Sequence, residues 1–581
     1  MKDTNKRIEA LRRWMAEHGA AACVIPQANP HLGEYVEPHW QARAWFSGFT
    51  GSAGTLALTD REAGLWTDSR YFLQAEEQLA GTPVTLMRSG TDTPWDEWLE
   101  ARVQGSGKVV AADARLFSCR RWNRLAALLP MRDDASFEDL WTTRPPLGSA
   151  AAFVLPERVA GARAGDKLAA LRREAGLRGE RRMLLTSLDN IGWLLNLRGG
   201  DLEFSPLLRC FLLVDARGGE LFAQPSALDS GVKGYLDKLH IKVWPYESLR
   251  GRLESLPAGC LAADFAETPA AVMSWTSVED VPDPVPEWKA HKNAAELRAM
   301  RRAMLQDGVM WVKFLRAFAE RRRGAEGMRE SDVGALLKRL KSEREGCWGE
   351  SFGTIAAAGD HGAVVHYAVT PESDRPVGDK GLLLIDTGTQ YEGATTDMTR
   401  VLACGPLTAE ERRDCTMVMK AHIALASAVF PDGVTGAALD GIARGPLWKQ
   451  GLDFGHGTGH GVGAMLNVHE DPVRVSWVSD CPFEEGMVTS DEPGLYRAGK
   501  HGVRLENLLA VERADETEFG CFLKFNVLTL CPFDVSTLCP EYMTDAERGW
   551  LNAYHRRVKE ELRPLLDEDE NNWLNEYAYE I

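Results

Sequence analysis

Hydrophobic positions along the chain follow helical and strand periods in turn, which predicts domains that mix helices with sheets. Residues 7–13 and 167–173 each place apolar side chains on one face of a short helix. Each helix pattern is followed by two apolar runs of strand length, at 22–26, 54–58, 183–186 and 210–214. This alternation is typical of α/β domains, and its recurrence predicts that the first domain is duplicated in the second.

Two proline-rich stretches separate the segments of the chain. Arg144-Pro145-Pro146 follows the first segment, and residues 281–286 carry proline at every second position after the second segment. Proline cannot continue a helix or serve a central strand, so both stretches are predicted to be linkers. With 581 residues the chain is too long for one core, and the predicted domains are 1–145, 146–286 and 287–581.

The third segment starts with a pattern that predicts one long helix. Apolar side chains at helical spacing form a stripe that we expect in the core, made of Leu297, Met300, Met304, Trp311, Phe314 and Leu315. Beyond it, apolar strands alternate with carboxylate-bearing loops up to about residue 535. The tail is rich in Glu, Asp and Trp and predicts one or two terminal helices, with a solvated acidic run at 567–570.

Composition narrows the class of protein. A chain with 44% hydrophobic and 26% charged residues should fold throughout, and its net charge of −17 opposes binding to nucleic acid. The N-terminus carries charges where a signal peptide needs apolar residues, and no run approaches a membrane span, so we expect a cytoplasmic protein without a membrane partner. The 11 cysteines include no CxxC pair, which favours reduced thiols over disulfides or a thiolate zinc site.

The first chemical signal is a pair of carboxylates on neighbouring strands. The apolar run 382–385 predicts a buried strand that ends at Asp386. A turn containing Gly393 returns the chain, so that Asp397 faces Asp386 across a hairpin. A buried carboxylate without a cation or hydrogen bonds is costly, so a positively charged partner is implied.

A second pair follows the same design near the C-terminal end. Glu492 and Glu506 flank a glycine-containing turn on two further predicted strands. One such carboxylate alone more often caps a helix or pairs with an arginine. Two carboxylate hairpins in one domain, however, place four oxygen ligands around one centre, which suits hard or borderline divalent cations.

Imidazoles lie between and before these hairpins. His456 and His460 alternate with glycines, which let the backbone approach a ligand closely, and His469 follows. His366 ends another short apolar run upstream. One of the histidines in the glycine-rich stretch is the natural fifth ligand, and the pattern alone does not say which.

The motifs resemble the pita-bread metallopeptidases, the family of methionine aminopeptidase, prolidase and aminopeptidase P. The match is closest to the long, three-domain cytosolic aminopeptidases P, through the motifs at 31–35, 46–55, 65–74 and 188–199. The fold class implied is α/β (α+β), with two creatinase-like N-terminal α/β domains and a pita-bread catalytic domain. The resemblance implies five ligands to two metal ions, with Asp397 and Glu506 bridging: Asp386, Asp397, His460, Glu492 and Glu506.

The same resemblance implies roles around the metals. His366 and His469 would contact the substrate at the scissile bond, and Arg504 would orient the bridging carboxylates. His456 matches a histidine near the substrate pocket. Tyr496 would line that pocket. Its motif matches that of the short enzymes, whereas many long enzymes have two aromatic residues there. The family also implies a homodimer.

The activity implied is release of the N-terminal residue from peptides whose second residue is proline. A hydroxide that bridges two metals would attack the bond, and Glu492 would take its proton. Four carboxylates and one imidazole favour Mn²⁺ on hardness, and leave Zn²⁺, Co²⁺ and Fe²⁺ open. The alternatives are a prolidase that cuts only Xaa-Pro dipeptides and a non-catalytic pita-bread binding protein.

Overall fold

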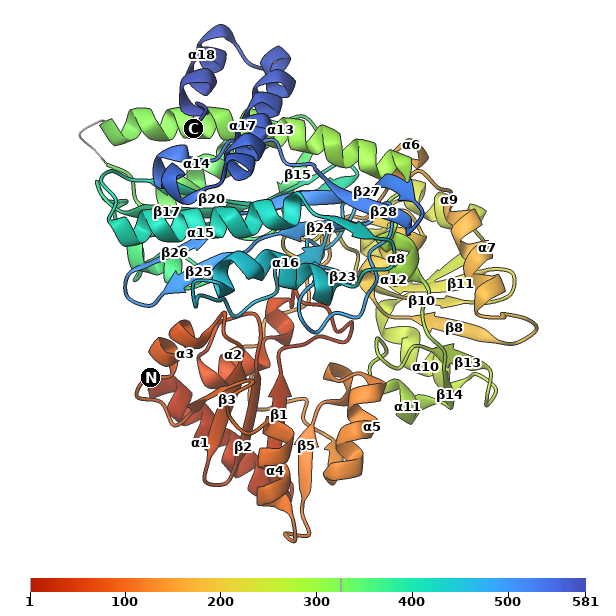
Figure 1. The fold of residues 1–581 in the computed structure, drawn as a ribbon. Helices are drawn as coiled ribbons and strands as arrows, with labels where there is room; N and C mark the ends of the chain where they lie inside the picture. The colour runs from red at the N-terminus through yellow and green to blue at the C-terminus, as the bar shows by residue number, and fades with distance from the viewer. Residues whose placement is uncertain (1, 324–326) are drawn as a thin grey trace. The chain divides into compact units, whose positions relative to one another are not determined.

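The computed structural model describes residues 2–323 and 327–581 and contains two compact units (Figure 1). One unit comprises Met1–Pro156 and Ala162–Val285, and the other comprises Glu157–Gly161 and Pro286–Ile581. The two predicted N-terminal domains thus fall in the first unit except for Glu157–Gly161 and Pro286, and the predicted catalytic domain makes up nearly all of the second. The boundaries at residues 145 and 286 stay predictions.

The first unit holds two six-stranded sheets of one design. Their strand orders are β4-β3-β2-β1-β5-β6 and β12-β11-β10-β8-β13-β14, and corresponding neighbours run in the same relative directions. The predicted duplication is therefore confirmed. The strands are β1 (Ala20–Pro26), β2 (Thr55–Thr59), β3 (Ala63–Thr67), β4 (Thr85–Arg88), β5 (Val109–Ala112), β6 (Met131–Asp133), β8 (Arg182–Leu185), β10 (Cys210–Val214), β11 (Gly219–Ala223), β12 (Ile241–Trp244), β13 (Leu261–Ala263) and β14 (Val278–Asp280).

Helices cover both faces of the first of these sheets, which explains its continuous apolar strands. Cys23 and Ile25 of β1 pack in the core of α1 (Lys2–Glu17), whereas Ala22 and Val24 pack on the other face with α4 (Trp95–Val103). Successive side chains of a strand point to opposite faces, so a strand buried on both faces must be apolar throughout. The predicted helices 7–13 and 167–173 lie within α1 and α7 (Ala164–Glu174).

The second predicted linker is shorter than its prolines indicate. Helix α12 (Val285–Ala290) begins inside the stretch 281–286, with Pro286 as its second residue. Proline is tolerated in the first turn of a helix, because the N–H that it lacks has no intrahelical partner there. The prediction of a linker up to residue 286 was therefore wrong for its last two residues.

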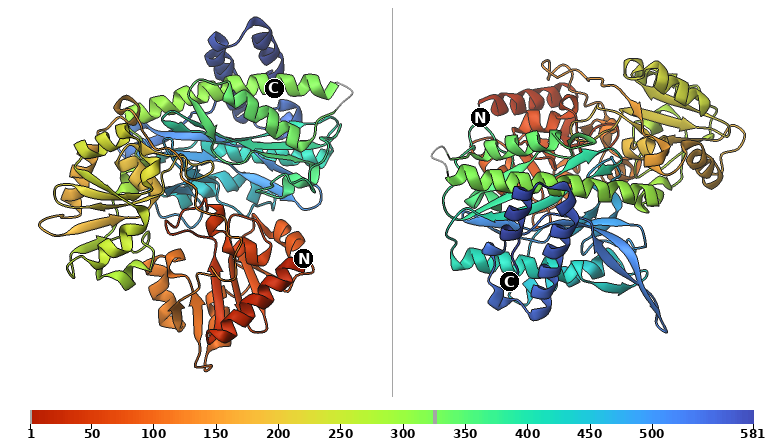
Figure 2. Two further views of the ribbon diagram at one scale, coloured as in Figure 1. Left: turned by 180° about the vertical axis from the view of Figure 1, so that it is seen from behind. Right: turned by 90° about the horizontal axis from the view of Figure 1, so that it is seen from above.

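The second unit is built around the predicted long helix, which is α13 (Ala294–Arg323). Met300, Met304, Trp311 and Phe314 of the predicted stripe are fully buried. Helices α17 (Asp545–Leu562) and α18 (Glu568–Tyr577) pack against α13 (Figures 1 and 2). Among the helices of the described ranges, none combines the length and the apolar character that a membrane crossing requires.

The strands of this unit form several small sheets. The strand orders are β16-β17-β20, β15-β18-β19 and β21-β28-β27-β24-β22-β23, and β25 pairs with β26. Helices α14 (Glu330–Ser342), α15 (Ala409–Ala426) and α16 (Gly436–Trp448) complete the unit. The strands are β15 (Cys347–Glu350), β16 (Ile355–Ala358), β17 (Leu382–Thr387), β18 (Thr389–Tyr391), β19 (Ala394–Thr395), β20 (Met398–Ala403), β21 (Val429–Pro431), β22 (Gly459–Gly461), β23 (Glu470–Val475), β24 (Val488–Asp491), β25 (Gly494–Arg497), β26 (His501–Arg504), β27 (Asn507–Thr517) and β28 (Gly520–Val527).

Strand β17 delivers the first candidate ligand from a position buried on both faces. Leu383 and Ile385 pack in the core of α13 and α14, whereas Leu382 and Leu384 pack in the core that contains α15. Asp386 continues the second series, because residues i and i+2 of a strand share a face. The apolar run therefore carries a carboxylate into the interior of the unit.

The acidic run at 567–570 has a structural role that the sequence analysis did not assign. The Asp567 side chain caps the first turn of α18 and forms a capping box with Glu570. Glu570 is buried and pairs with Lys313 of α13 at 2.6 Å. The prediction of a solvated run was therefore wrong for Glu570, which attaches α18 to the long helix.

Candidate metal centre

The first carboxylate pair lies on β17 and directly before β20. Asp386 is opposite Thr399 in the antiparallel register, and Asp397 lies two residues before Thr399. Asp397 is therefore on the same face as Asp386, in the diagonal position. The predicted hairpin also contains β18 and β19, whose turn includes Gly393 with φ of 82°.

The second pair is directly opposed. Asp491 pairs with Asn507, and Gly494 pairs with Arg504. Continuing this register through the gap between the two strand pairs places Glu492 opposite Glu506. Like charges in opposed positions destabilise a sheet unless a cation lies between them, so the backbone itself indicates a cation site.

His460 approaches both carboxylate pairs from β22. Its Nε2 atom lies 3.4 Å from Oδ2 of Asp397 and 3.3 Å from Oε1 of Glu492. Its Nδ1 atom donates to the carbonyl of Gly461 at 2.8 Å. Because Nδ1 is engaged in this way, Nε2 is the nitrogen that a metal can bind after it loses its proton, so His460 is the candidate ligand among the histidines of the glycine-rich stretch.

The candidate ligands form one buried cluster with unused oxygen atoms. Asp397, His460 and Glu506 each bring one ligand atom, all within 4.8 Å of one another. Within the described ranges, one oxygen of each of Asp386, Asp397 and Glu506 is buried without a hydrogen-bond partner. Buried polar atoms are almost always satisfied, so these oxygens fit a site built for divalent cations.

The charges of the cluster change the pKa values of its members. Burial raises the pKa of Asp386 to about 6, although Arg504 lowers it. Burial likewise raises the pKa of Glu492 and, together with the charge of Asp397, that of Glu506. Burial alone would lower the pKa of His460, but Asp397 and Glu492 raise it to about 9. In the metal-free protein a proton thus offsets part of the negative charge that metal ions would neutralise.

Arg504 joins the cluster to the predicted pocket residues. Its Nη2 atom donates to Oδ2 of Asp386 at 2.6 Å, and its Nη1 atom donates to the Tyr496 hydroxyl at 3.0 Å. The same hydroxyl lies 2.7 Å from Nε2 of His456. Arg504 was expected to orient the bridging carboxylates, but its direct carboxylate contact is to Asp386. It reaches Glu506 only through Thr399.

The two remaining histidines lie on different segments. The ring of His469 packs edge-on against that of His460, with 4.2 Å between the centroids. His366 is half-buried on the segment that follows the 3-10 helix η5 (Gly359–Ala363). The structure therefore brings His469 beside the cluster. The substrate contacts of His366 and His469 stay predictions.

Two hydroxyl residues that support the cluster were missed in the sequence analysis. Thr399 donates to Oε2 of Glu506 at 2.7 Å and accepts from Arg504 Nε at 3.2 Å. Ser490 donates to Oε1 of Glu492 at 3.2 Å and accepts from the backbone N–H of His460 at 2.9 Å. Thr399 lies two residues after Asp397, and Ser490 lies two residues before Glu492. The strand period, which places residues i and i+2 on one face, was therefore a usable signal for both.

The fold and this cluster define a metallopeptidase of the pita-bread class. The model of metallopeptidase family M24 matches residues 298–513, which contain all five candidate ligands. The Creatinase/Prolidase N-terminal domain matches twice, at 7–142 and 143–296, and the C-terminal region of peptidase M24 matches 521–581. The predicted fold class is confirmed.

Relatives that match over the full length identify the family more closely. The chain is 34% identical to aminopeptidase P2 of Arabidopsis thaliana, over 97% of this chain and 86% of the relative. It is also 34% identical to a probable Xaa-Pro aminopeptidase P of Fusarium vanettenii, over 100% and 99%. The chain belongs to the aminopeptidase P family.

Solved structures agree with this assignment. The cytosolic X-prolyl aminopeptidase of Caenorhabditis elegans, described as having a di-nuclear active site, matches with a TM-score of 0.90. It is 31% identical, and the match covers 97% of this chain and 95% of that one. A prolidase of Thermococcus sibiricus matches 64% of this chain with 23% identity and a TM-score of 0.52, which shows a shared fold.

Proposed function

We propose that the chain is a metal-dependent aminopeptidase that hydrolyses the N-terminal Xaa-Pro bond of peptides. One observation supports this activity most: a cluster of four carboxylates and His460, with unused oxygens on its three buried members, lies inside a chain that resembles aminopeptidases P along its whole length. A non-catalytic binding protein would gain nothing from these costly buried charges.

The residues that would hold two divalent metal ions are Asp386, Asp397, His460, Glu492 and Glu506, with Asp397 and Glu506 shared between them. The chemistry that such ions supply when bound is Lewis acidity toward a carbonyl and toward water. The ligand set of four carboxylates and one imidazole favours Mn²⁺ among the available divalent ions.

The chain's own groups would handle the protons and the substrate. Glu492 would accept the proton of the attacking water on a carboxylate oxygen and pass it to the leaving nitrogen. The imidazoles of His366 and His469 would donate hydrogen bonds to the carbonyl oxygen as it gains charge. Arg504 holds Asp386 in place and fixes the Tyr496 hydroxyl, which lies beside His456. We place Tyr496 and His456 in the wall of the substrate pocket.

The activity is tested on metal-stripped protein with and without added Mn²⁺. We expect metal-dependent release of the first residue from Arg-Pro-Pro and no release from Arg-Ala-Pro. Turnover of an Xaa-Pro dipeptide without turnover of Arg-Pro-Pro would favour the prolidase reading. Absence of cleavage in protein that holds two metal ions would refute both enzymatic readings and favour a binding protein.

Three further properties complete the proposal. We infer a cytoplasmic homodimer and a division into domains 1–145, 146–286 and 287–581. The resemblance to the long aminopeptidases P supports these inferences, and the Caenorhabditis elegans enzyme is cytosolic, which agrees with the location. Cell fractionation, sedimentation equilibrium and limited proteolysis near residues 145 and 286 test them in turn.

A further inference from the structure

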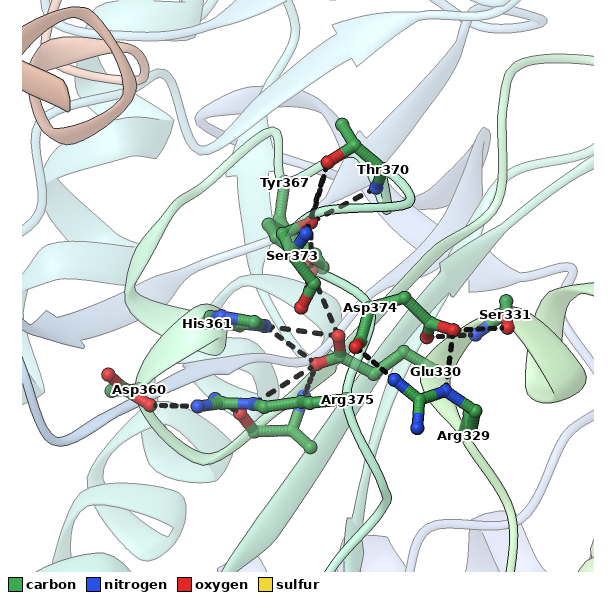
Figure 3. Close-up of polar contacts among 11 residues, drawn as sticks. Arg329, Glu330, Ser331, Asp360, His361, Tyr367, Thr370, Ser373, Asp374 and Arg375 are labelled. Atoms are coloured by element: carbon green, nitrogen blue, oxygen red, sulfur yellow. Dashed lines mark hydrogen bonds and ion pairs between the residues drawn. The ribbon is translucent and has the colours of Figure 1, made fainter. Parts of the chain in front are cut away.

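A second buried carboxylate cluster lies in the catalytic unit, outside the candidate metal centre (Figure 3). Its central residue is Glu330, the first residue of α14, whose side chain is 0% exposed. The Glu330 carboxylate accepts from the backbone N–H of Ala358 at 2.7 Å, from Nδ1 of His361 at 2.9 Å and from the Tyr367 hydroxyl at 2.9 Å. A carboxylate that is fully buried and bound by three donors imposes a fixed geometry on those donors.

The donors lie on both sides of His366 in the sequence. Ala358 ends β16, His361 is in η5, and Tyr367 directly follows His366. The backbone N–H of Glu330 also donates to the carbonyl of Arg375 at 3.0 Å, and the Arg375 guanidinium lies 3.6 Å from the carboxylate. One residue therefore holds the chain segment 358–375 at its beginning, next to His366 and at its end. Figure 3 shows the contacts of Glu330 with His361, Tyr367 and Arg375.

This segment needs such an attachment, because it has little regular structure of its own. Between η5 and β17 the chain runs from residue 364 to 381 without a helix or a multi-residue strand. Long irregular segments inside compact domains are commonly functional, and they keep one conformation only where specific contacts hold them. The Arg329–Asp374 ion pair at 2.7 Å is partly exposed and adds less than a buried contact would.

The other side of the segment packs against the strand of Arg504. A Cβ atom on Gly502 of β26 would lie 1.7 Å from the Gly362 carbonyl oxygen, so the two backbones are in direct contact. Arg504 lies two residues further along the same strand. The segment is thus held between Glu330 on one side and the strand of the metal centre on the other, and a shift at Glu330 would move His366 relative to that centre.

From this arrangement we propose that Glu330 is a positioning residue for catalysis, which sets the place of His366 through His361 and Tyr367. The proposal rests on the proposed function, because it assumes that His366 contacts the substrate. Glu330 touches neither metal ligands nor substrate in this scheme. Its effect on the reaction passes entirely through the segment that it holds.

The test is a double-mutant cycle with Glu330→Gln and His366→Ala on Mn²⁺-loaded protein. Glutamine preserves the size of the side chain but loses the charge that all three donors share. We expect Glu330→Gln to lower kcat/KM for Arg-Pro-Pro by about 10- to 100-fold with two metal ions still bound. In the His366→Ala background the same substitution should change kcat/KM by less than about twofold, because residues that act as one unit are not additive.

A matched control separates positioning from loss of stability. Glu570→Gln changes another buried, ion-paired glutamate of the same unit, which attaches α18 to α13 and lies outside the His366 segment. We expect Glu570→Gln to lower the unfolding temperature and to leave kcat/KM within about twofold of wild type. If Glu330→Gln does not fold, Tyr367→Phe removes a single donor instead. It should lower kcat/KM by less than Glu330→Gln, and its effect on kcat/KM should likewise shrink in the His366→Ala background.

The outcomes distinguish the two proposals. Wild-type protein that holds two metal ions and does not cleave Arg-Pro-Pro overturns the proposed function. An active wild type in which the Glu330 and His366 effects on kcat/KM multiply overturns the positioning role alone. A crystal structure of Glu330→Gln gives a readout that does not depend on activity. Displacement of residues 359–367 is expected, and an unchanged segment would overturn the inference.

Discussion

Replacing Arg504 by lysine is the perturbation that tests most directly how the metal centre is organised. Arg504 is 1% exposed, and its guanidinium uses three nitrogen atoms on three partners: Asp386, Tyr496 and Thr399. Thr399 in turn donates to Glu506. One planar group therefore fixes a carboxylate of the first hairpin directly and one of the second through a hydroxyl.

Lysine keeps the charge but offers one nitrogen on a flexible stem. It can retain the contact to Asp386 and must lose those to Tyr496 and Thr399. Hydrogen bonds to charged groups contribute about 1.5–3 kcal/mol each, so the two lost bonds amount to about 3–6 kcal/mol. The contact to Thr399, at 3.2 Å, is the longer of the two lost bonds, so we expect an energetic loss at the low end of this range. A loss of about 3 kcal/mol corresponds to a decrease in kcat of about 100-fold.

The assay is steady-state hydrolysis of Arg-Pro-Pro by Mn²⁺-loaded protein, with the metal content of each variant determined in parallel. Tyr496→Phe removes the bond to Arg504 and also the contact of the hydroxyl with His456, so it should lose at least about tenfold. Arg497→Lys is the matched control, because Arg497 lies in the same β25–β26 hairpin but binds Asp414, away from the candidate ligands. It should stay within about twofold of wild type.

Two results would refute the reasoning. Arg504→Lys protein that binds two metal ions and keeps kcat within threefold of wild type would show that the guanidinium does not organise the centre. Loss of a metal ion from the same variant, with activity restored by excess Mn²⁺, would assign Arg504 to metal affinity instead of geometry.

Two further predictions concern the metals. Asp397→Asn should lower the content of tightly held metal from two ions to at most one, because Asp397 lies beside His460 and we propose it as a ligand of both ions; two ions retained in elemental analysis would contradict its ligand role. Burial raises the pKa of Asp386 to about 6 and also raises the pKa of Glu506. These two groups therefore bind protons more tightly in the folded metal-free protein than in the unfolded chain. The stability that they contribute falls as the pH rises from about 4 through 6. Metal ions need the ionised carboxylates, so the rise in Tm on adding Mn²⁺ should grow between pH 5 and 7. A rise in Tm that is independent of pH would contradict this linkage.

Features set by local sequence were predictable. The long helix was readable because its apolar stripe has the helical period. The stripe is buried as expected except for Leu297, which is partly buried. The pairing of Glu492 with Glu506 was readable because a short hairpin fixes its own register. The topology of the first unit was readable in outline, because the helix and strand pattern occurs twice.

Features set by distant contacts were not predictable in the same way. Glu330 binds His361 and Tyr367, which are 31 and 37 residues away, and no periodicity links them. The burial of Glu570 depends on Lys313, which is 257 residues away. The capping box at Asp567 and Glu570 was readable, however, because an N-cap residue followed three positions later by glutamate is a local signal.

The charge of the candidate centre gives a physical reason for two metal ions. Four ionised carboxylates and one protonated Arg504 carry a formal charge of about −3 in an interior where unpaired charge is costly. One divalent cation would leave this interior negative, whereas two would make it slightly positive and able to hold a single anionic group. The strands around these carboxylates pack in apolar cores, and Asp386, Asp397 and Glu506 are buried. Packing of the fold thus holds together negative charges that metal ions would neutralise more fully than protons and Arg504 do, and the binding of metal and the order of the two hairpins should depend on each other.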